Sequence, residues 1–213
     1  MIAKFVTCDF ELMVLLTHQI YRNMELFTIA DVSEVCLIML QNNDLGFRTR
    51  FRIKFADKVK HSNISKTDIN FNQSVLIMKA FRNAVNDYKV WLAVDLLIQK
   101  AIKVDLEGAE NVSKEDLMDM INCLAYKEVQ SINTWQFLSS RFINCMVSES
   151  LELNDLISGV ISFKSVAIKS PELYEMICNY FTYKQYTVED LELYDNNGRI
   201  IKFFNSVASM YGA

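Results

Sequence analysis

The sequence is poor in residues that interrupt helices. Its 213 residues include one proline and five glycines. A β-sandwich or β-barrel needs many such residues for its turns, and a nucleotide-binding α/β fold places glycines in its phosphate loops. Both architectures are therefore disfavoured, and the sequence predicts an almost entirely helical chain.

Histidine is scarce as well, and the cysteines lack a metal-binding pattern. His18 and His61 cannot supply a His-rich metal site, and His18 falls between apolar residues as a core histidine would. The five cysteines form an odd set without a C-x-x-C pair: Cys8, Cys36, Cys123, Cys145 and Cys178. This usage is typical of buried thiols in a reducing compartment. We therefore expect no metal, no cofactor, no small-molecule substrate and no catalysis.

Long apolar runs and a secretory leader are also missing. The longest apolar stretches, residues 12–16 and 90–98, are too short to span a bilayer. Residues 1–11 lack the apolar core of a signal peptide and the Arg-rich character of a transit peptide, so any organellar address is expected to have been removed or to lie elsewhere. With 51% hydrophobic residues, the chain is predicted to be one soluble domain over residues 1–213.

A short pattern recurs along the chain: an apolar residue, Ser or Thr, two free positions, Asp, and another apolar residue. It predicts helix starts, because the hydroxyl caps the third helical amide and the carboxylate favours the helix N-terminus. One further instance, at Glu152, has Glu in place of the hydroxyl residue. The predicted repeat starts are Thr28, Ser65, Ser113, Glu152 and Thr187.

Each start opens a first helix, and a second apolar helix precedes the next start in a shared register. The residues 14, 10 and 6 places before three of the starts are Phe51, Phe55 and Val59; Leu138, Phe142 and Met146; and Leu173, Ile177 and Phe181. The starts are 37, 48, 39 and 35 residues apart, and the long interval is assigned to a polar loop over residues 104–111. Gly159 falls inside a helix, where it predicts close packing of a neighbour.

Helix pairs of this size cannot bury their apolar faces alone, so neighbours must stack. The sequence therefore predicts an all-α fold, an α-solenoid of about five helix-turn-helix repeats. A compact helical bundle with incidental capping motifs is the alternative, because such motifs begin helices in any helical protein.

Charge is distributed unevenly. Residues 1–106 carry a net charge of +3 and residues 107–213 carry −7. A cluster of cations on one predicted helix flanks an apolar row formed by Phe47, Phe51 and Phe55. Like charges this close repel one another, and bound phosphates would relieve that repulsion. A solvated face, pairing with acids of the same chain, or contact with an acidic protein would also explain the cluster. The predicted nucleic-acid-binding residues are Arg48, Arg50, Arg52, Lys54, Lys58 and Lys60.

The repeated helix start, with a second helix in each unit of about 37 residues, resembles the organellar helical repeats of the octotricopeptide, heptatricopeptide and FAST-kinase-like group. The resemblance covers residues 10–195 and implies a mitochondrial or plastid protein that binds RNA or belongs to a ribonucleoprotein such as the mitochondrial ribosome. Unlike many members, this chain is acidic and has no basic, nuclease-like C-terminal domain, which favours a structural subunit.

We therefore expect a non-catalytic scaffold whose basic helix meets RNA, such as rRNA, and whose acidic half meets other protein subunits. A stand-alone helical adaptor of the viral Bcl-2-like kind, which binds a partner helix in a groove, is the second hypothesis. A structural subunit of another organellar membrane complex is a third.

Overall fold

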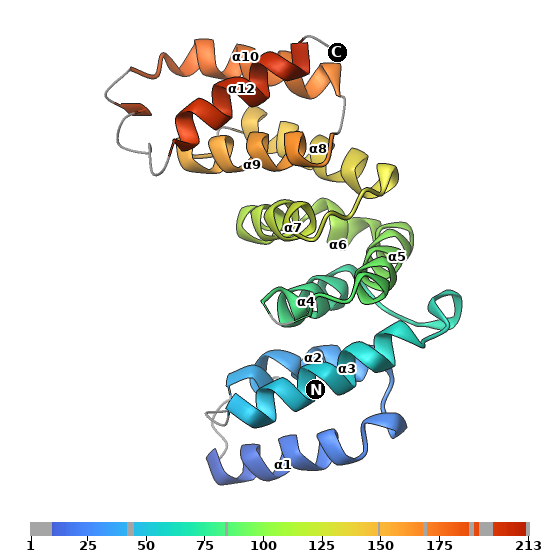
Figure 1. Cartoon of the computed structure of the whole chain (residues 1–213). Helices are drawn as coiled ribbons and strands as arrows, with labels where there is room; N and C mark the ends of the chain where they lie inside the picture. The colour runs from blue at the N-terminus through green and yellow to red at the C-terminus, as the bar shows by residue number, and fades with distance from the viewer. Residues whose placement is uncertain are drawn as a thin grey trace. The chain divides into compact units, whose positions relative to one another are not determined.

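The computed structural model describes residues 10–41, 45–83, 85–148, 150–167, 170–187, 190–191 and 198–211. These residues form helices and no strand (Figure 1), which confirms the all-α prediction. The chain divides into two compact units, residues 1–111 and 112–213. A solenoid that continues through both units as one domain stays a prediction.

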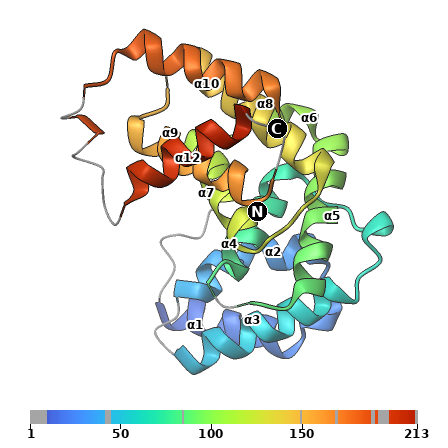
Figure 2. The same ribbon diagram turned by 45° about the horizontal axis from the view of Figure 1, so that its top comes forward.

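Unit 1 contains α1 to α6. Their bounds are α1 Phe10–Arg22, α2 Ile29–Gln41, α3 Leu45–Lys60, α4 Phe71–Phe81, α5 Tyr88–Val104 and α6 Leu106–Glu110, with 3-10 turns η2 at Met24–Leu26 and η3 at Ile64–Lys66. In Figures 1 and 2, α2 lies beside α4 and α3 lies beside α5, and the residues of each pair are in contact. Helices α2, α3 and α4 thus each pack on the next helix but one, whereas α1 packs on α2.

Unit 2 contains the remaining described helices. They are α7 Lys114–Tyr126, α8 Ile132–Val147, α9 Leu153–Ser165, α10 Pro171–Lys184 and α12 Arg199–Tyr211. As in unit 1, alternate helices pack together: α7 on α9 and α8 on α10. The last helix, α12, packs on α9 and α10.

Polar contacts in both units join residues 40 positions apart. In unit 1 the Cys36 thiol on α2 donates to the Leu76 carbonyl oxygen on α4 at 3.6 Å. In unit 2 the Ser162 hydroxyl on α9 donates to Oδ1 of Asn122 on α7 at 2.9 Å. This separation is the length of one helix pair, and contacts at that interval are what neighbouring α-hairpins produce within a unit.

Two of the predicted hydroxyl caps form with reciprocal hydrogen bonds. The Asp31 amide donates to Oγ1 of Thr28 at 3.1 Å, and the Thr28 amide donates to the Asp31 carboxylate at 2.9 Å. Thr187 and Asp190 make the same pair of bonds at 3.1 and 2.8 Å. The hydroxyl bond to Asp31 lowers the pKa of its carboxyl group, and the Thr187 amide lowers that of Asp190. These two capping predictions are confirmed.

The predicted starts at Ser113 and Glu152 are confirmed as well. Oγ of Ser113 accepts the Asp116 amide at 3.1 Å at the start of α7. Glu152 is the N-cap of α9, and its amide donates to the Asp155 carboxylate at 3.3 Å.

The predicted start at Ser65 is wrong. Ser65 lies in η3, and its hydroxyl donates to Oδ1 of Asn63 rather than capping a helix. The N-cap of the next helix, α4, is Asn70, whose side chain accepts the Gln73 amide while the Gln73 side chain accepts the Asn70 amide. With Asn70 in place of Ser65, the caps are 42, 43, 39 and 35 residues apart.

The polar loop predicted over residues 104–111 is also wrong, because these residues form α6 and its flanks. Asp105 explains the helix. Its Oδ1 accepts the Gly108 amide at 3.0 Å and its Oδ2 accepts the Phe71 amide at 3.0 Å. One carboxylate therefore satisfies free amides at the starts of both α6 and α4.

The predicted core rows are largely buried, but the predicted register is wrong for α3, because Val59 lies 11 residues before the cap Asn70 and not 6 before Ser65. Phe51, Phe55 and Val59 are fully buried on α3, as are Leu138, Phe142 and Met146 on α8. On α10, Leu173 and Ile177 are buried and Phe181 is half-buried. Before the first start, at Thr28, Ile20 and Met24 are buried whereas Leu16 is 40% exposed.

Candidate functional site

Helix α3 carries its aromatic and basic residues on different faces. Phe47, Phe51 and Phe55 are buried, as predicted. The six predicted RNA-binding cations occupy the rest of the helix: Arg48, Arg50, Arg52, Lys54, Lys58 and Lys60. Arg50 is exposed, and the other five are half-buried. The contacts of each cation therefore decide which of them can meet a ligand.

Lys54 is neutralised within the chain. Its ammonium nitrogen lies 2.8 Å from Oε1 of Glu25 and donates to the Tyr21 carbonyl oxygen at 3.0 Å. It also lies 5.4 Å from the centre of the Tyr21 ring. The hydrogen bond from Lys54 lowers the pKa of Glu25. These contacts join α3 to the residues around the end of α1 and leave Lys54 little capacity for a phosphate.

Lys60 and Arg52 join α3 to other helices. Nζ of Lys60 lies 2.7 Å from Oδ2 of Asp87, the N-cap of α5, and this bond lowers the pKa of Asp87. Nε of Arg52 donates to the Ala80 carbonyl oxygen on α4 at 3.2 Å. Burial, followed by the charge of Arg48, lowers the pKa of Arg52. Both side chains therefore contribute to the packing of unit 1.

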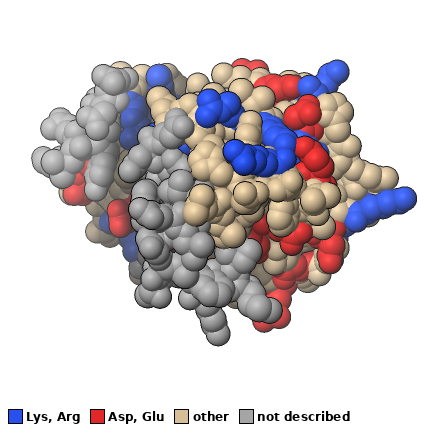
Figure 3. Space-filling view, turned by 90° about the horizontal axis from the view of Figure 1, so that it is seen from below, with Lys and Arg blue, Asp and Glu red and all other residues tan. Residues whose placement is uncertain are grey.

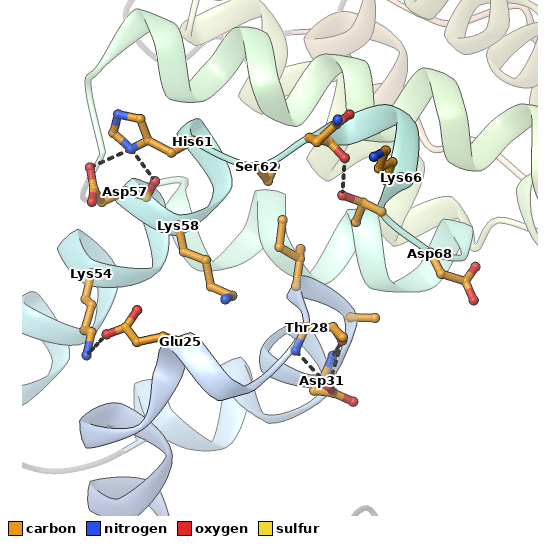
Figure 4. Close-up of a pocket in the computed structure, with 14 residues that line it drawn as sticks. Glu25, Thr28, Asp31, Lys54, Asp57, Lys58, His61, Ser62, Lys66 and Asp68 are labelled. Atoms are coloured by element: carbon orange, nitrogen blue, oxygen red, sulfur yellow. Dashed lines mark hydrogen bonds and ion pairs between the residues drawn. The ribbon is translucent and has the colours of Figure 1, made fainter.

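A pocket of about 910 Å³ opens between the start of α2, the C-terminal half of α3 and the segment that includes η3 (Figure 4). Both cationic and anionic side chains line it. Its lining includes Glu25, Thr28, Asp31, Lys54, Asp57, Lys58, His61, Lys66 and Asp68. The pocket is therefore lined by two lysines of α3, Lys54 and Lys58, and by Lys66, which lies in η3.

Lys58 and Lys66 are the two lysines of this pocket that form no ion pair with an acid among the described residues, although the charge of Lys58, after that of Lys54, helps to lower the pKa of Glu25. Figure 4 shows the Lys58 side chain extending into the space between α3 and the start of α2. Neither side chain makes a hydrogen bond or an ion pair with any residue in the described part of the chain. Lys58 was among the predicted site residues, whereas Lys66 was assigned no role.

Most of the acids around the pocket are already engaged. The Glu25 carboxylate pairs with Lys54, and the Asp31 carboxylate accepts hydrogen bonds from the Thr28 amide and hydroxyl. Oδ1 of Asp57 lies 3.1 Å from Nδ1 of His61. Asp68, which is exposed, is the remaining acid. Lys58 and Lys66 are thus the positive groups that an anion entering the pocket would meet.

Lys100 of α5 positions the segment that carries Lys66. Its ammonium nitrogen donates to the carbonyl oxygens of Ile64, Ser65 and Thr67 at 3.2, 2.9 and 2.5 Å. Three carbonyls gathered on one ammonium group hold this segment in a tight turn, which explains why no α-helix begins at Ser65. Sequence reasoning missed Lys100, because the residues that it contacts lie 33 to 36 positions earlier.

The charged residues do not form one uniform basic surface. On the face seen in Figure 3, blue Lys and Arg atoms lie next to red Asp and Glu atoms. This agrees with the pairing of Lys54 and Lys60 with acids of the same chain. A ligand for this region therefore has to select the cations that are not already paired.

Other candidate chemistry is limited among the described residues. These residues contain no group of three or more His, Cys, Asp or Glu side chains that could hold a metal ion, and no helix long and apolar enough to cross a membrane. The His18 ring is half-buried and packs on Phe47, with 4.6 Å between ring centres.

The cysteines divide into two groups. Cys36 and Cys123 are buried, as predicted, whereas Cys145 and Cys178 are only half-buried. Burial raises the pKa of the Cys178 thiol, which disfavours the reactive thiolate. Cys8 lies outside the described residues.

Comparison with known protein families, with characterised proteins and with solved structures finds no match to this chain.

Proposed function

We propose that this protein is a non-catalytic helical subunit of an organellar ribonucleoprotein, such as the mitochondrial ribosome, and that it contacts RNA through the pocket of unit 1. Lys58 and Lys66 bind phosphate groups, and the acidic unit 2 contacts other protein subunits. The organellar setting comes from the resemblance of the capped repeats to organellar helical-repeat proteins.

One observation supports the RNA contact above all others. Lys58 and Lys66 border the same pocket and form no hydrogen bond or ion pair with the described residues, whereas the nearby Lys54 and Lys60 each form an ion pair with an acid. Two ammonium groups that border one pocket attract anions, and the phosphates of an RNA backbone offer negative charges at successive positions.

The proposal narrows the predicted site. Arg52, Lys54 and Lys60 hold α3 to its neighbours. Replacing them would therefore mainly lower the stability of the fold and would not report directly on RNA binding. Lys58 stays in the site, and Lys66 joins it from η3. A structural subunit with a small contact area of this kind would depend on its protein neighbours for most of its affinity.

The test compares two charge-matched variants of the full chain. Lys58→Gln with Lys66→Gln removes the proposed contacts, and Lys164→Gln with Lys202→Gln removes two exposed cations of unit 2. A fluorescent single-stranded RNA of about 20 nucleotides serves as the probe, with its binding followed by anisotropy. The first variant should bind at least about fivefold more weakly than the second. Equal affinity of the two variants would exclude RNA from this pocket.

A further inference from the structure

The starts of α5 in unit 1 and α8 in unit 2 share a motif, in which a buried tryptophan donates a hydrogen bond to the carbonyl oxygen of a valine six residues earlier. In unit 1, Nε1 of Trp91 donates to the Val85 carbonyl oxygen at 2.8 Å, and in unit 2, Nε1 of Trp135 donates to the Val129 carbonyl oxygen at 2.6 Å. Both indoles are buried, and each lies four residues after a helix N-cap. The starts of α5 and α8 are therefore equivalent, and their residues can be compared position by position.

The exposed positions on the outer faces of α5 and α8 agree at the first residue and differ further along. The first residue of each helix is an exposed apolar one: Tyr88 is 60% exposed on α5, and Ile132 is 68% exposed on α8. One and two turns later the helices differ. On α5 these positions hold Leu92 and Leu96, which are 40% and 51% exposed.

The equivalent positions on α8 hold polar residues. Gln136 and Ser140 are exposed there, in a helix that begins in the same way and buries its tryptophan in the same way. The hairpin therefore folds with a polar outer face, and packing within unit 1 does not require the leucines of α5. Exposing a continuous apolar stripe is unfavourable in water unless a partner covers it.

The stripe has the dimensions of a helix-binding surface. Tyr88, Leu92 and Leu96 follow i, i+4 and i+8, so they lie on one face of α5 over about 12 Å. At the start of α5 lies a pocket of about 230 Å³, whose lining is half apolar and half polar: Ile53, Ala56, Val85 and Val90 with Asp57, Lys60, Asn86 and Asp87. Apolar side chains of an amphipathic helix would pack along the stripe beside it.

Charge indicates which kind of helix would bind. The exposed charged residues of α5 are lysines, Lys89 near its start and Lys103 near its end, and its single acid, Asp95, is buried. The exposed acid that precedes the helix, Asp87, is paired with Lys60. A second copy of this chain that presented its own α5 would place lysines against lysines. A partner helix with acidic residues beside its apolar stripe would instead place opposite charges next to each other.

We infer that the outer face of α5 docks an amphipathic helix of another protein, one whose apolar stripe is flanked by Asp or Glu. Tyr88, Leu92 and Leu96 supply the apolar contact, and Lys89 and Lys103 select for the acidic flanks. No residue of α5 lines the pocket of Lys58 and Lys66, so the inference does not rest on the RNA proposal.

The test uses the full chain and two synthetic helical peptides of about 18 residues. Both peptides carry leucines along one helical face, and they differ only in flanks of Glu or of Lys. The Glu-flanked peptide should bind at least about tenfold more tightly in fluorescence anisotropy. Absence of binding, or equal binding of the two peptides, would overturn the inference.

Variants assign the binding to α5. Leu92→Gln with Leu96→Ser transfers the α8 residues onto α5 and should weaken binding of the Glu-flanked peptide about tenfold, whereas Ile132→Gln on α8 should leave it unchanged. Lys89→Gln with Lys103→Gln changes only exposed residues and should remove the preference between the peptides. A wild-type dimer in sedimentation that Leu92→Gln with Leu96→Ser dissociates would instead assign the face to a second copy.

Discussion

The ring of Phe142 occupies the space that a side chain at residue 159 would need. A Cβ atom built on Gly159 would lie 2.5 Å from Cε2 of Phe142. Gly159 is buried in the middle of α9, and Phe142 is fully buried on α8. The glycine therefore allows the ring of one helix to reach the backbone of the other, as its position inside a helix predicted.

Replacing this glycine should destabilise the protein. Gly159→Ala would improve helix propensity by about 1 kcal/mol, but the new methyl group would clash with a rigid ring, and overpacking of this kind costs about 1–3 kcal/mol. We expect a net loss of stability in urea unfolding. Combining it with Phe142→Leu should give a smaller loss than the two single changes added together. Strictly additive losses would show that the two positions are not coupled.

The position of the helix start before α4 can be tested by removing single caps. Asn70→Ala should cost about 1 kcal/mol, because it leaves the Gln73 amide without its acceptor. Ser65→Ala should change the free energy of unfolding by less than about 0.5 kcal/mol, since Ser65 caps no helix. A larger loss of stability for Ser65→Ala than for Asn70→Ala would show that the helix starts at Ser65, as the sequence pattern predicted.

The predicted helix starts show which features of the fold the sequence could predict and which it could not. A hydroxyl followed three residues later by an acid predicted the caps at Thr28, Ser113 and Thr187, because capping is a local interaction. At Ser65 the same pattern failed, because Lys100 gathers the nearby carbonyls from 33 to 36 residues away in the sequence. A local pattern contains no information about such a distant donor.

The sequence predicted some features of the candidate site and could not predict others. The helical spacing predicted the buried Phe row of α3, and with it the position of the cations on the remaining faces. It could not predict that Glu25 and Asp87 neutralise Lys54 and Lys60, since the partners lie 29 and 27 residues apart. The repeated Val and Trp spacing at the starts of α5 and α8, by contrast, was present in the sequence and could have been found.

The contacts of Lys100 lead to a prediction about the loop that carries Lys66. Lys100→Met should leave the carbonyls of Ile64, Ser65 and Thr67 without their donor, at a cost of about 1–3 kcal/mol. Hydrogen exchange of the amides in residues 63–68 should accelerate. The exposed Lys103 provides the control, and Lys103→Met should leave exchange in this segment unchanged. Equal effects of the two changes would exclude a specific anchoring role.

The paired acids predict a loss of stability in acid. The Lys60 hydrogen bond lowers the pKa of Asp87 in the folded protein, so this pair stabilises the fold above the unfolded pKa of the carboxyl group and stops doing so as the pH falls through the folded value. The free energy of unfolding should therefore decrease between about pH 5 and pH 3. Lys60→Gln should make that decrease shallower. A slope identical to that of the wild type would show that the pair does not form in solution.

The most direct test of the RNA proposal is the dependence of binding on salt. If Lys58 and Lys66 each contact one phosphate of a single-stranded RNA, then the slope of log Kobs against log salt concentration should be shallower by about 1.4 in Lys58→Gln with Lys66→Gln than in the wild type. The variant Lys164→Gln with Lys202→Gln should keep the wild-type slope. An unchanged slope in the pocket variant would contradict the account.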